Sequence, residues 1–117
     1  MIGELRSVVL DCRDPHALAR FYSELLGWPV VRVDGDWVDI GDGQGRRLSF
    51  QHAPEHEPPR WPDPGFPQQV HLDIGVQDIA EAEATVLALG ATRLPSTEPG
   101  FRVYADPAGH PFCLEEP

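Results

Sequence analysis

The fold is decided by residues 8–28, which have the sequence VVLDCRDPHALARFYSELLGW. An apolar strand-like segment comes first, and Asp14 then supplies an N-cap side chain ahead of Pro15 at the first helical position. Leu18, Phe21, Tyr22, Leu25 and Leu26 follow at the spacing of one helix face. Gly27 is typical of the residue directly after a helix end. The stretch therefore predicts a strand, a short turn and an amphipathic helix.

A second helix of the same design is predicted in the other half of the chain. Asp78 is its N-cap, and Glu81 stands three residues later as the capping-box partner. At an offset of 64 residues, Asp14 aligns with Asp78, and the strand at 48–51 aligns with the strand at 112–115. The two halves therefore form a structural repeat. The apolar face of the second helix consists of Ile79, Ala82, Val86 and Leu89, and Gly90 ends it.

Short apolar segments bounded by turn residues predict eight strands. Each half has the order βαβββ, so the fold class is α+β. The predicted modules cover 1–52 and 70–117 of a single domain, and a linker over 53–69 joins them because it holds six of the 13 prolines. The predicted strands are Leu5–Asp11, Val30–Val33, Trp37–Ile40, Leu48–Gln51, Val70–Val76, Thr92–Leu94, Phe101–Ala105 and Phe112–Glu115.

The composition narrows the classes of function. The 117 residues include 19 acidic side chains and nine arginines but no lysine, for a net charge of −10. The absence of lysine excludes a Schiff-base enzyme and a P-loop, and the acidic charge makes nucleic acids and anionic membranes poor partners. No segment has the length of a membrane span, and residues 1–10 lack the features of a signal peptide. Cys12 and Cys113 form no disulfide framework, so we expect a cytoplasmic location.

Three stretches of the chain resemble the vicinal oxygen chelate superfamily, the group of glyoxalases, bleomycin resistance proteins and dioxygenases. They are residues 8–28, residues 70–92 with the segment VHLDI, and residues 105–114 with the sequence ADPAGHPFCL. The first and third are most similar to the glyoxalase-like subfamily. The resemblance implies a cupped, mostly antiparallel eight-stranded sheet with helices outside and a cavity inside.

The resemblance also implies where a metal would bind. Metal-dependent members use four side chains, one from the first and one from the last strand of each module, at the positions of Ser7, Ser49, His71 and Cys113. Only His71 keeps the ligand type of the family, and two serines are poor ligands. We therefore expect no cofactor. The alternative is one divalent metal ion held by His71 with Gln51 and Glu115, which lie two residues from the family positions.

Strand alternation gives an independent prediction of the cavity. One set of strand residues is apolar and packs under the helices, and the opposite set is polar. That face is either solvated or lines a binding cavity roofed by Trp61 and Phe66, and we expect the cavity. Its carboxylates favour a cationic or hydroxyl-rich ligand. The predicted ligand-binding residues are Ser7, Asp11, Trp37, Asp39, Ser49, Gln51, His71, Asp73, Cys113 and Glu115.

Two classes of function follow. The first is a small-molecule-binding protein similar to the bleomycin resistance branch, which needs no catalytic metal. The second is a lyase, isomerase or dioxygenase that uses a divalent metal or has His71 as a general base oriented by an aspartate. His71 is otherwise a hydrogen-bonding residue of the cavity, and Cys113 is expected to be a buried small apolar residue rather than a nucleophile. Family members of this size commonly dimerise, so we expect a homodimer.

Overall fold

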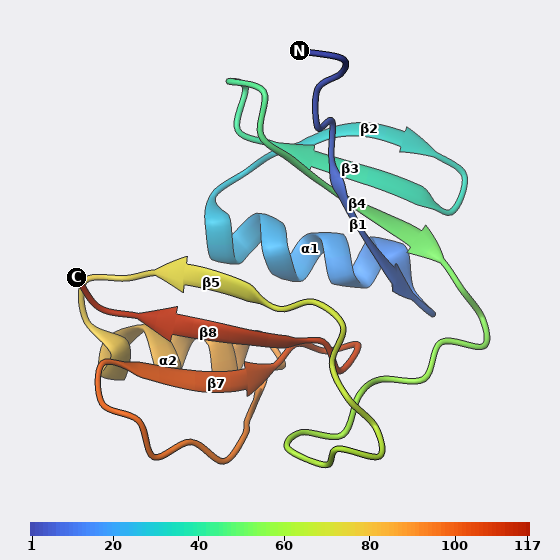
Figure 1. Cartoon of the computed structure of the whole chain (residues 1–117). Helices are drawn as coiled ribbons and strands as arrows, with labels where there is room; N and C mark the ends of the chain where they lie inside the picture. The colour runs from blue at the N-terminus through green and yellow to red at the C-terminus, as the bar shows by residue number, and fades with distance from the viewer. The chain divides into compact units, whose positions relative to one another are not determined.

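The computed structural model describes all 117 residues, which divide into two compact units, Met1–His56 and Glu57–Pro117. Each unit contains one helix and one four-stranded sheet (Figure 1). The α+β class and the repeated βαβββ order are confirmed, with the eight strands divided equally between two sheets. The boundary at 56/57 falls within the predicted linker, so most of that proline-rich segment belongs to the second unit. Neither helix is long and apolar enough to cross a membrane.

In the first unit, helix α1 covers one face of the sheet, whose strand order is β1-β4-β3-β2 (Figure 1). Strands β1 and β4 are parallel, and the other neighbours are antiparallel. Leu18, Phe21 and Tyr22 of α1 are buried, and the Tyr22 ring stacks on Phe50 of the sheet at 5.8 Å between centroids. The elements are β1 (Val8–Cys12), α1 (Pro15–Leu26), β2 (Val30–Asp34), β3 (Trp37–Gly41) and β4 (Arg47–His52).

Helix α1 has the ends that its sequence predicts. The Asp14 carboxylate accepts a hydrogen bond from the Ala17 backbone N–H at 3.1 Å, and Pro15 occupies the first turn. At the other end, Gly27 adopts φ 70°, a left-handed conformation that a side chain makes costly. Its N–H donates to the Ser23 carbonyl at 2.9 Å. Local sequence therefore fixes both the length and the position of the helix.

The second unit repeats this topology with the strand order β5-β8-β7-β6. In the first unit Val8 pairs with Leu48, and in the second Leu72 pairs with Phe112, so both strands keep the 64-residue offset of the sequence repeat. The duplication is therefore a duplication of strand register as well as of element order. The elements are β5 (Leu72–Gly75), α2 (Ile79–Ala88), β6 (Thr92–Arg93), β7 (Phe101–Ala105) and β8 (Pro111–Glu115).

Helix α2 is held to its sheet by a polar contact as well as by apolar packing. Its buried residues are Ile79 and Val86 alone. Glu83, between them, accepts hydrogen bonds from Arg102 at 2.7 Å and from the Tyr104 hydroxyl at 3.0 Å, both on β7. Because the Tyr104 residue is fully buried, its hydroxyl depends on that carboxylate. The hydrogen bonds of Glu83 to Arg102 and Tyr104 thus add to the attachment of a short helix that buries only two residues.

Three predicted strands are longer than the observed ones. Strand β1 begins at Val8 rather than Leu5, because sheet pairing with β4 starts there and residues 1–6 are exposed. Strand β5 begins at Leu72 rather than Val70, and β6 has two residues. Ser7 and His71, which we placed within strands, therefore each lie one residue before the strand.

Candidate functional site

Four predicted site residues of the first unit form a hydrogen-bond network centred on Asp39 and Ser49. Ser49 donates to the Asp39 carboxylate at 2.5 Å, and the Trp37 indole N–H donates to the same oxygen at 2.7 Å. The Ser7 and Ser49 hydroxyls lie 2.5 Å apart. The single Ser49 proton is used by Asp39, and the Ser7 hydroxyl also donates to the Val8 carbonyl at 3.2 Å. The predicted site residues Ser7, Trp37, Asp39 and Ser49 are thus hydrogen-bonded to one another.

The charge of Asp39 is also compensated within the first unit. Its second carboxylate oxygen lies 3.7 Å from one guanidinium nitrogen of Arg32 and 3.7 Å from one of Arg47. Asp39 is 2% exposed and Ser49 is 1% exposed, so this part of the predicted face is sealed from solvent. Asp39 therefore acts inside the unit as the acceptor that organises Trp37 and the two serines.

Asp11 and Gln51, the other predicted residues of the first unit, are exposed. They are register partners at the ends of β1 and β4. The alternation around them is as predicted, since Leu10 and Cys12 are buried on the opposite side. Gln51 belongs to the first unit, whereas His71 and Glu115, its partners in the predicted metal trio, belong to the second.

The second unit brings its predicted site residues together. The His71 Nε2 atom lies 3.2 Å from the Asp73 carboxylate, and Asp73 is the register partner of Cys113. One ligand atom from each of these three residues lies within 4.8 Å of the others. The His71 and Asp73 side chains are half-exposed, whereas Cys113 is 8% exposed. Asp73 is thus in direct contact with the His71 imidazole.

Two groups of this cluster, Cys113 and Glu115, have raised pKa values. Burial, together with the negative charges of Asp73 and Glu115, raises the pKa of the Cys113 thiol to about 11. The charge of Asp73 raises the pKa of Glu115, and burial and a hydrogen bond to Asp73 raise it further. The charge of His71 lowers the same pKa and so reduces the rise. Cys113 is therefore a neutral thiol near pH 7, which agrees with the expectation that it is not a nucleophile.

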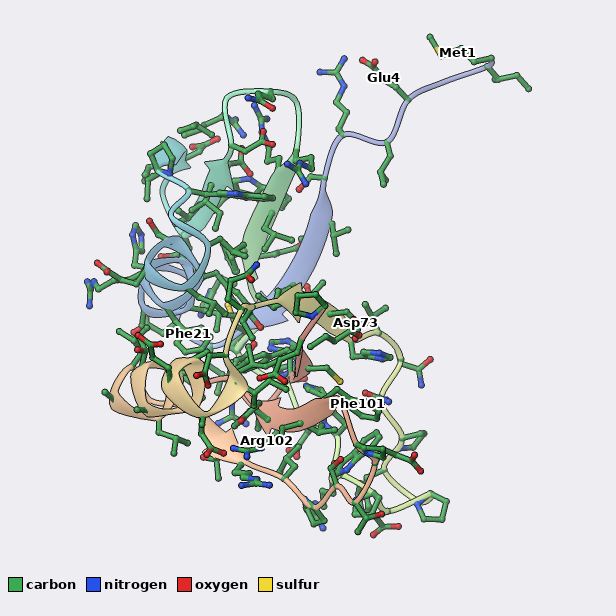
Figure 2. The ribbon with its side chains drawn as sticks, turned by 90° about the vertical axis from the view of Figure 1, so that its left-hand side faces the viewer. Met1, Glu4, Phe21, Asp73, Phe101 and Arg102 are labelled. Carbon is green, nitrogen blue, oxygen red and sulfur yellow. The ribbon has the colours of Figure 1, made fainter.

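A mostly apolar pocket of about 360 Å³ opens beside this cluster, and we call it the second-unit pocket. Phe101 and Val103 of β7 form one wall, and Trp61 forms another, held by a 2.9 Å hydrogen bond from its indole N–H to the Pro95 carbonyl. Figure 2 shows Phe101 and Asp73 on the side of this sheet away from α2. The pocket is lined by Trp61, Gln68, His71, Pro95, Ser96, Thr97, Glu98, Phe101, Val103, Pro111 and Cys113.

Sequence reasoning identified part of this pocket. His71, Cys113 and Trp61 were proposed, and all three line it. Phe66, proposed as a second roof residue, is exposed and packs instead against the Arg60 guanidinium at 4.1 Å. The alternation of β7 would have pointed to two lining residues that the sequence analysis missed, Phe101 and Val103. No pattern marks Gln68 or residues 95–98, which belong to irregular segments.

The four positions that correspond to the family's metal ligands do not fit a divalent ion. Ser7 and Ser49 are hydrogen-bonded to each other, and the Ser49 proton is given to Asp39. Binding an ion through them would break a buried network, and neutral hydroxyls would be weak replacements for imidazole or carboxylate. His71 and the neutral Cys113 thiol remain, one fewer than the three protein ligands of an ordinary open site.

Comparisons with known proteins agree with this architecture. A family model described as a glyoxalase-like domain matches residues 7–115. No curated protein matches the chain.

Several solved structures have the same fold. One is a glyoxalase/bleomycin resistance protein/dioxygenase family enzyme from Burkholderia phytofirmans, with 17% identity and a TM-score of 0.76 over 97% of this chain and 98% of its own. The fosfomycin resistance protein FosX from Listeria monocytogenes has 15% identity and a TM-score of 0.73 over 100% and 95%. A glyoxalase family protein from Enterococcus faecalis has 23% identity and a TM-score of 0.71 over 98% of both chains. At these identities the likeness establishes the fold alone.

Proposed function

The chain belongs to the glyoxalase-like domain family of the vicinal oxygen chelate superfamily, and from this membership we propose that it binds a small molecule in the second-unit pocket without the family's usual metal ion. The observation that carries the proposal is the pocket itself. Its lining combines apolar and aromatic residues, including Trp61 and Phe101, with the polar side chain of His71. An apolar cavity with a few polar groups has the general features of a ligand site.

The groups around His71 support recognition by hydrogen bonding. With Asp73 at 3.2 Å, the His71 imidazole has a fixed neighbour that orients its ring. Asp73 and Glu115 add negative charge, which favours a cationic or hydroxyl-rich group over an anionic one. Glu98, which also lines the pocket, acts in the same direction. An anionic ligand would meet no arginine among the lining residues.

A binding titration tests the proposal. Trp61 lies in the pocket, so a bound ligand should change its fluorescence. A small-molecule library screened by thermal shift should yield compounds that stabilise the wild-type protein, because binding to the folded state raises stability. Such compounds should lose most of their effect in Phe101→Ala and keep it in Phe66→Ala, a control outside the pocket. Equal loss in both variants would refute binding at this place.

A second candidate function is a reaction in which His71 transfers a proton. The specific observation that favours it is the 3.2 Å contact between Asp73 and His71, which lines the apolar pocket. In that reaction His71 would accept a proton from a bound substrate, and Asp73 would stabilise the imidazolium. Asp73→Asn should then lower turnover and shift its pH profile, whereas ligand binding would change little.

A metal-dependent reaction is the other form of this alternative. The ligand atoms of His71, Asp73 and Cys113 are close enough to make the test worthwhile. Elemental analysis of protein purified without a histidine tag should give far less than one divalent ion per chain. A near-stoichiometric ion that is lost in His71→Ala would contradict the metal-free proposal.

We also propose a homodimer in a reducing, cytoplasmic setting, where the buried Cys12 and Cys113 stay free thiols. Light scattering after size-exclusion chromatography measures the mass directly. A mass near 13 kDa would contradict the dimer, since that is the mass of one chain.

A further inference from the structure

Gln68 has an unsatisfied hydrogen-bond acceptor beside the second-unit pocket. The residue lines the pocket, and its amide oxygen Oε1 is buried without any hydrogen-bond partner. A buried acceptor without a donor is unfavourable and uncommon in folded proteins. The final torsion of a glutamine side chain is soft, so a small rotation can turn this oxygen toward a molecule in the pocket. An incoming N–H group would supply the missing donor.

We infer that the second-unit pocket selects an aromatic ligand that carries an N–H donor, and that Gln68 is the residue that selects it. The inference rests on the proposed function, since it assumes that this pocket binds a small molecule. Beyond that function, the inference names the chemical class of the ligand and the residue that determines specificity.

The other lining groups favour the same class of ligand. The Trp61 indole N–H already donates to the Pro95 carbonyl, so it is not available to a ligand. Glu98 adds an anionic acceptor to the pocket lining. The nearby cation of the Trp61 segment, Arg60, is not a lining residue, because its guanidinium is stacked on the exposed Phe66 ring. Trp61 and Phe101 provide two aromatic walls, on which a flat ring packs well.

Two probes with the same ring and the same charge, one with N–H donors and one without, test the inference. One is 2-naphthylmethylammonium, and the other is its quaternary trimethylammonium analogue, which has the same ring and charge but no N–H. Dissociation constants are measured by calorimetry for wild type, Gln68→Leu and Gln69→Leu. Leucine keeps most of the side-chain volume but removes the acceptor, and exposed Gln69 is the adjacent control.

The wild-type protein should bind the primary ammonium on the order of five- to tenfold more tightly than the quaternary one, as one hydrogen bond provides. Gln68→Leu should lower this ratio several-fold, and Gln69→Leu should leave it unchanged. Gln68→Glu, which keeps an acceptor and adds a charge, should preserve the preference and strengthen binding of both cations.

The outcomes separate the two proposals. If both probes bind but the ratio is the same in wild type and Gln68→Leu, the role of Gln68 is refuted and the binding pocket stands. If neither probe binds the wild type, the inference and the proposed pocket both fail for this ligand class. A Gln68→Glu variant that binds the primary ammonium more weakly than wild type would also overturn the inference.

Discussion

Replacing Asp39 with alanine should destabilise the first unit strongly, because the carboxylate organises the polar side of its sheet. The substitution removes the acceptor of two short hydrogen bonds, from Ser49 at 2.5 Å and from Trp37 at 2.7 Å. Hydrogen bonds to a charged group contribute about 1.5 kcal/mol or more each, so their loss costs about 3 kcal/mol. The contacts to Arg32 and Arg47 add a few tenths at most, since both guanidinium groups are well exposed.

Urea unfolding followed by tryptophan fluorescence measures this change, and thermal melting should show a midpoint lower by roughly 10 °C. Asp39→Asn keeps an acceptor oxygen and should lose only about 1 kcal/mol. Asp11→Ala is the matched control, because Asp11 is exposed on the same sheet and should change the free energy of unfolding by less than about 0.5 kcal/mol. If Asp39→Ala is no less stable than Asp11→Ala, the network does not stabilise the fold, and breaking it to bind a metal at Ser7 and Ser49 would cost little.

Four further predictions concern single residues. Glu83→Ala should reduce the free energy of unfolding by about 2 kcal/mol in urea titrations, because it leaves the buried Tyr104 hydroxyl without its acceptor. A change below about 0.5 kcal/mol would contradict the claim that Glu83 helps to hold α2 to its sheet. The Cys113 thiol should react slowly with iodoacetamide at pH 8 and faster as the pH approaches its pKa of about 11. Asp73→Asn should lower the pKa of Cys113 and speed the reaction at pH 8. An unchanged rate would show that Asp73 does not raise the pKa of this thiol. Since this pKa is raised above 9.0, the folded state holds the proton more tightly than the unfolded chain, so the contribution of Cys113 to stability should fall between about pH 9 and 11 in pH-dependent unfolding. Gly27→Ala should cost about 1 kcal/mol in the same unfolding assay because it forces a side chain into a left-handed conformation, and an equal or higher stability would refute that reasoning.

The sequence predicts the elements well where their signals are local. Asp14 and Asp78 mark helix starts by capping, and the 64-residue offset carries the strand register from one unit to the other. Strand alternation also predicts correctly that Leu10 and Cys12 are buried opposite the exposed Asp11. These features depend only on neighbours in the chain or on a repeat of the same pattern.

The site is harder to predict because it depends on contacts between segments without periodicity. The 57–69 segment and residues 95–98 have no strand or helix pattern, yet Trp61 and Pro95 meet there through a hydrogen bond. In the first unit, the sequence marks Asp39 as a polar strand residue. The partners that compensate its charge, Arg32 and Arg47, come from neighbouring strands, one beyond a register irregularity between Val30 and Arg32. Alternation alone cannot show that such a carboxylate is already satisfied.

The central claim is that this protein binds a small molecule in the second-unit pocket without a metal ion. Its most direct test is an NMR titration of chelator-treated protein with 2-naphthylmethylammonium. We predict saturable shifts of the Trp61 indole and of the Val103 and Cys113 amides, with the same dissociation constant before and after chelation. The absence of saturable shifts in these signals, or binding that requires an added divalent ion, would contradict the claim.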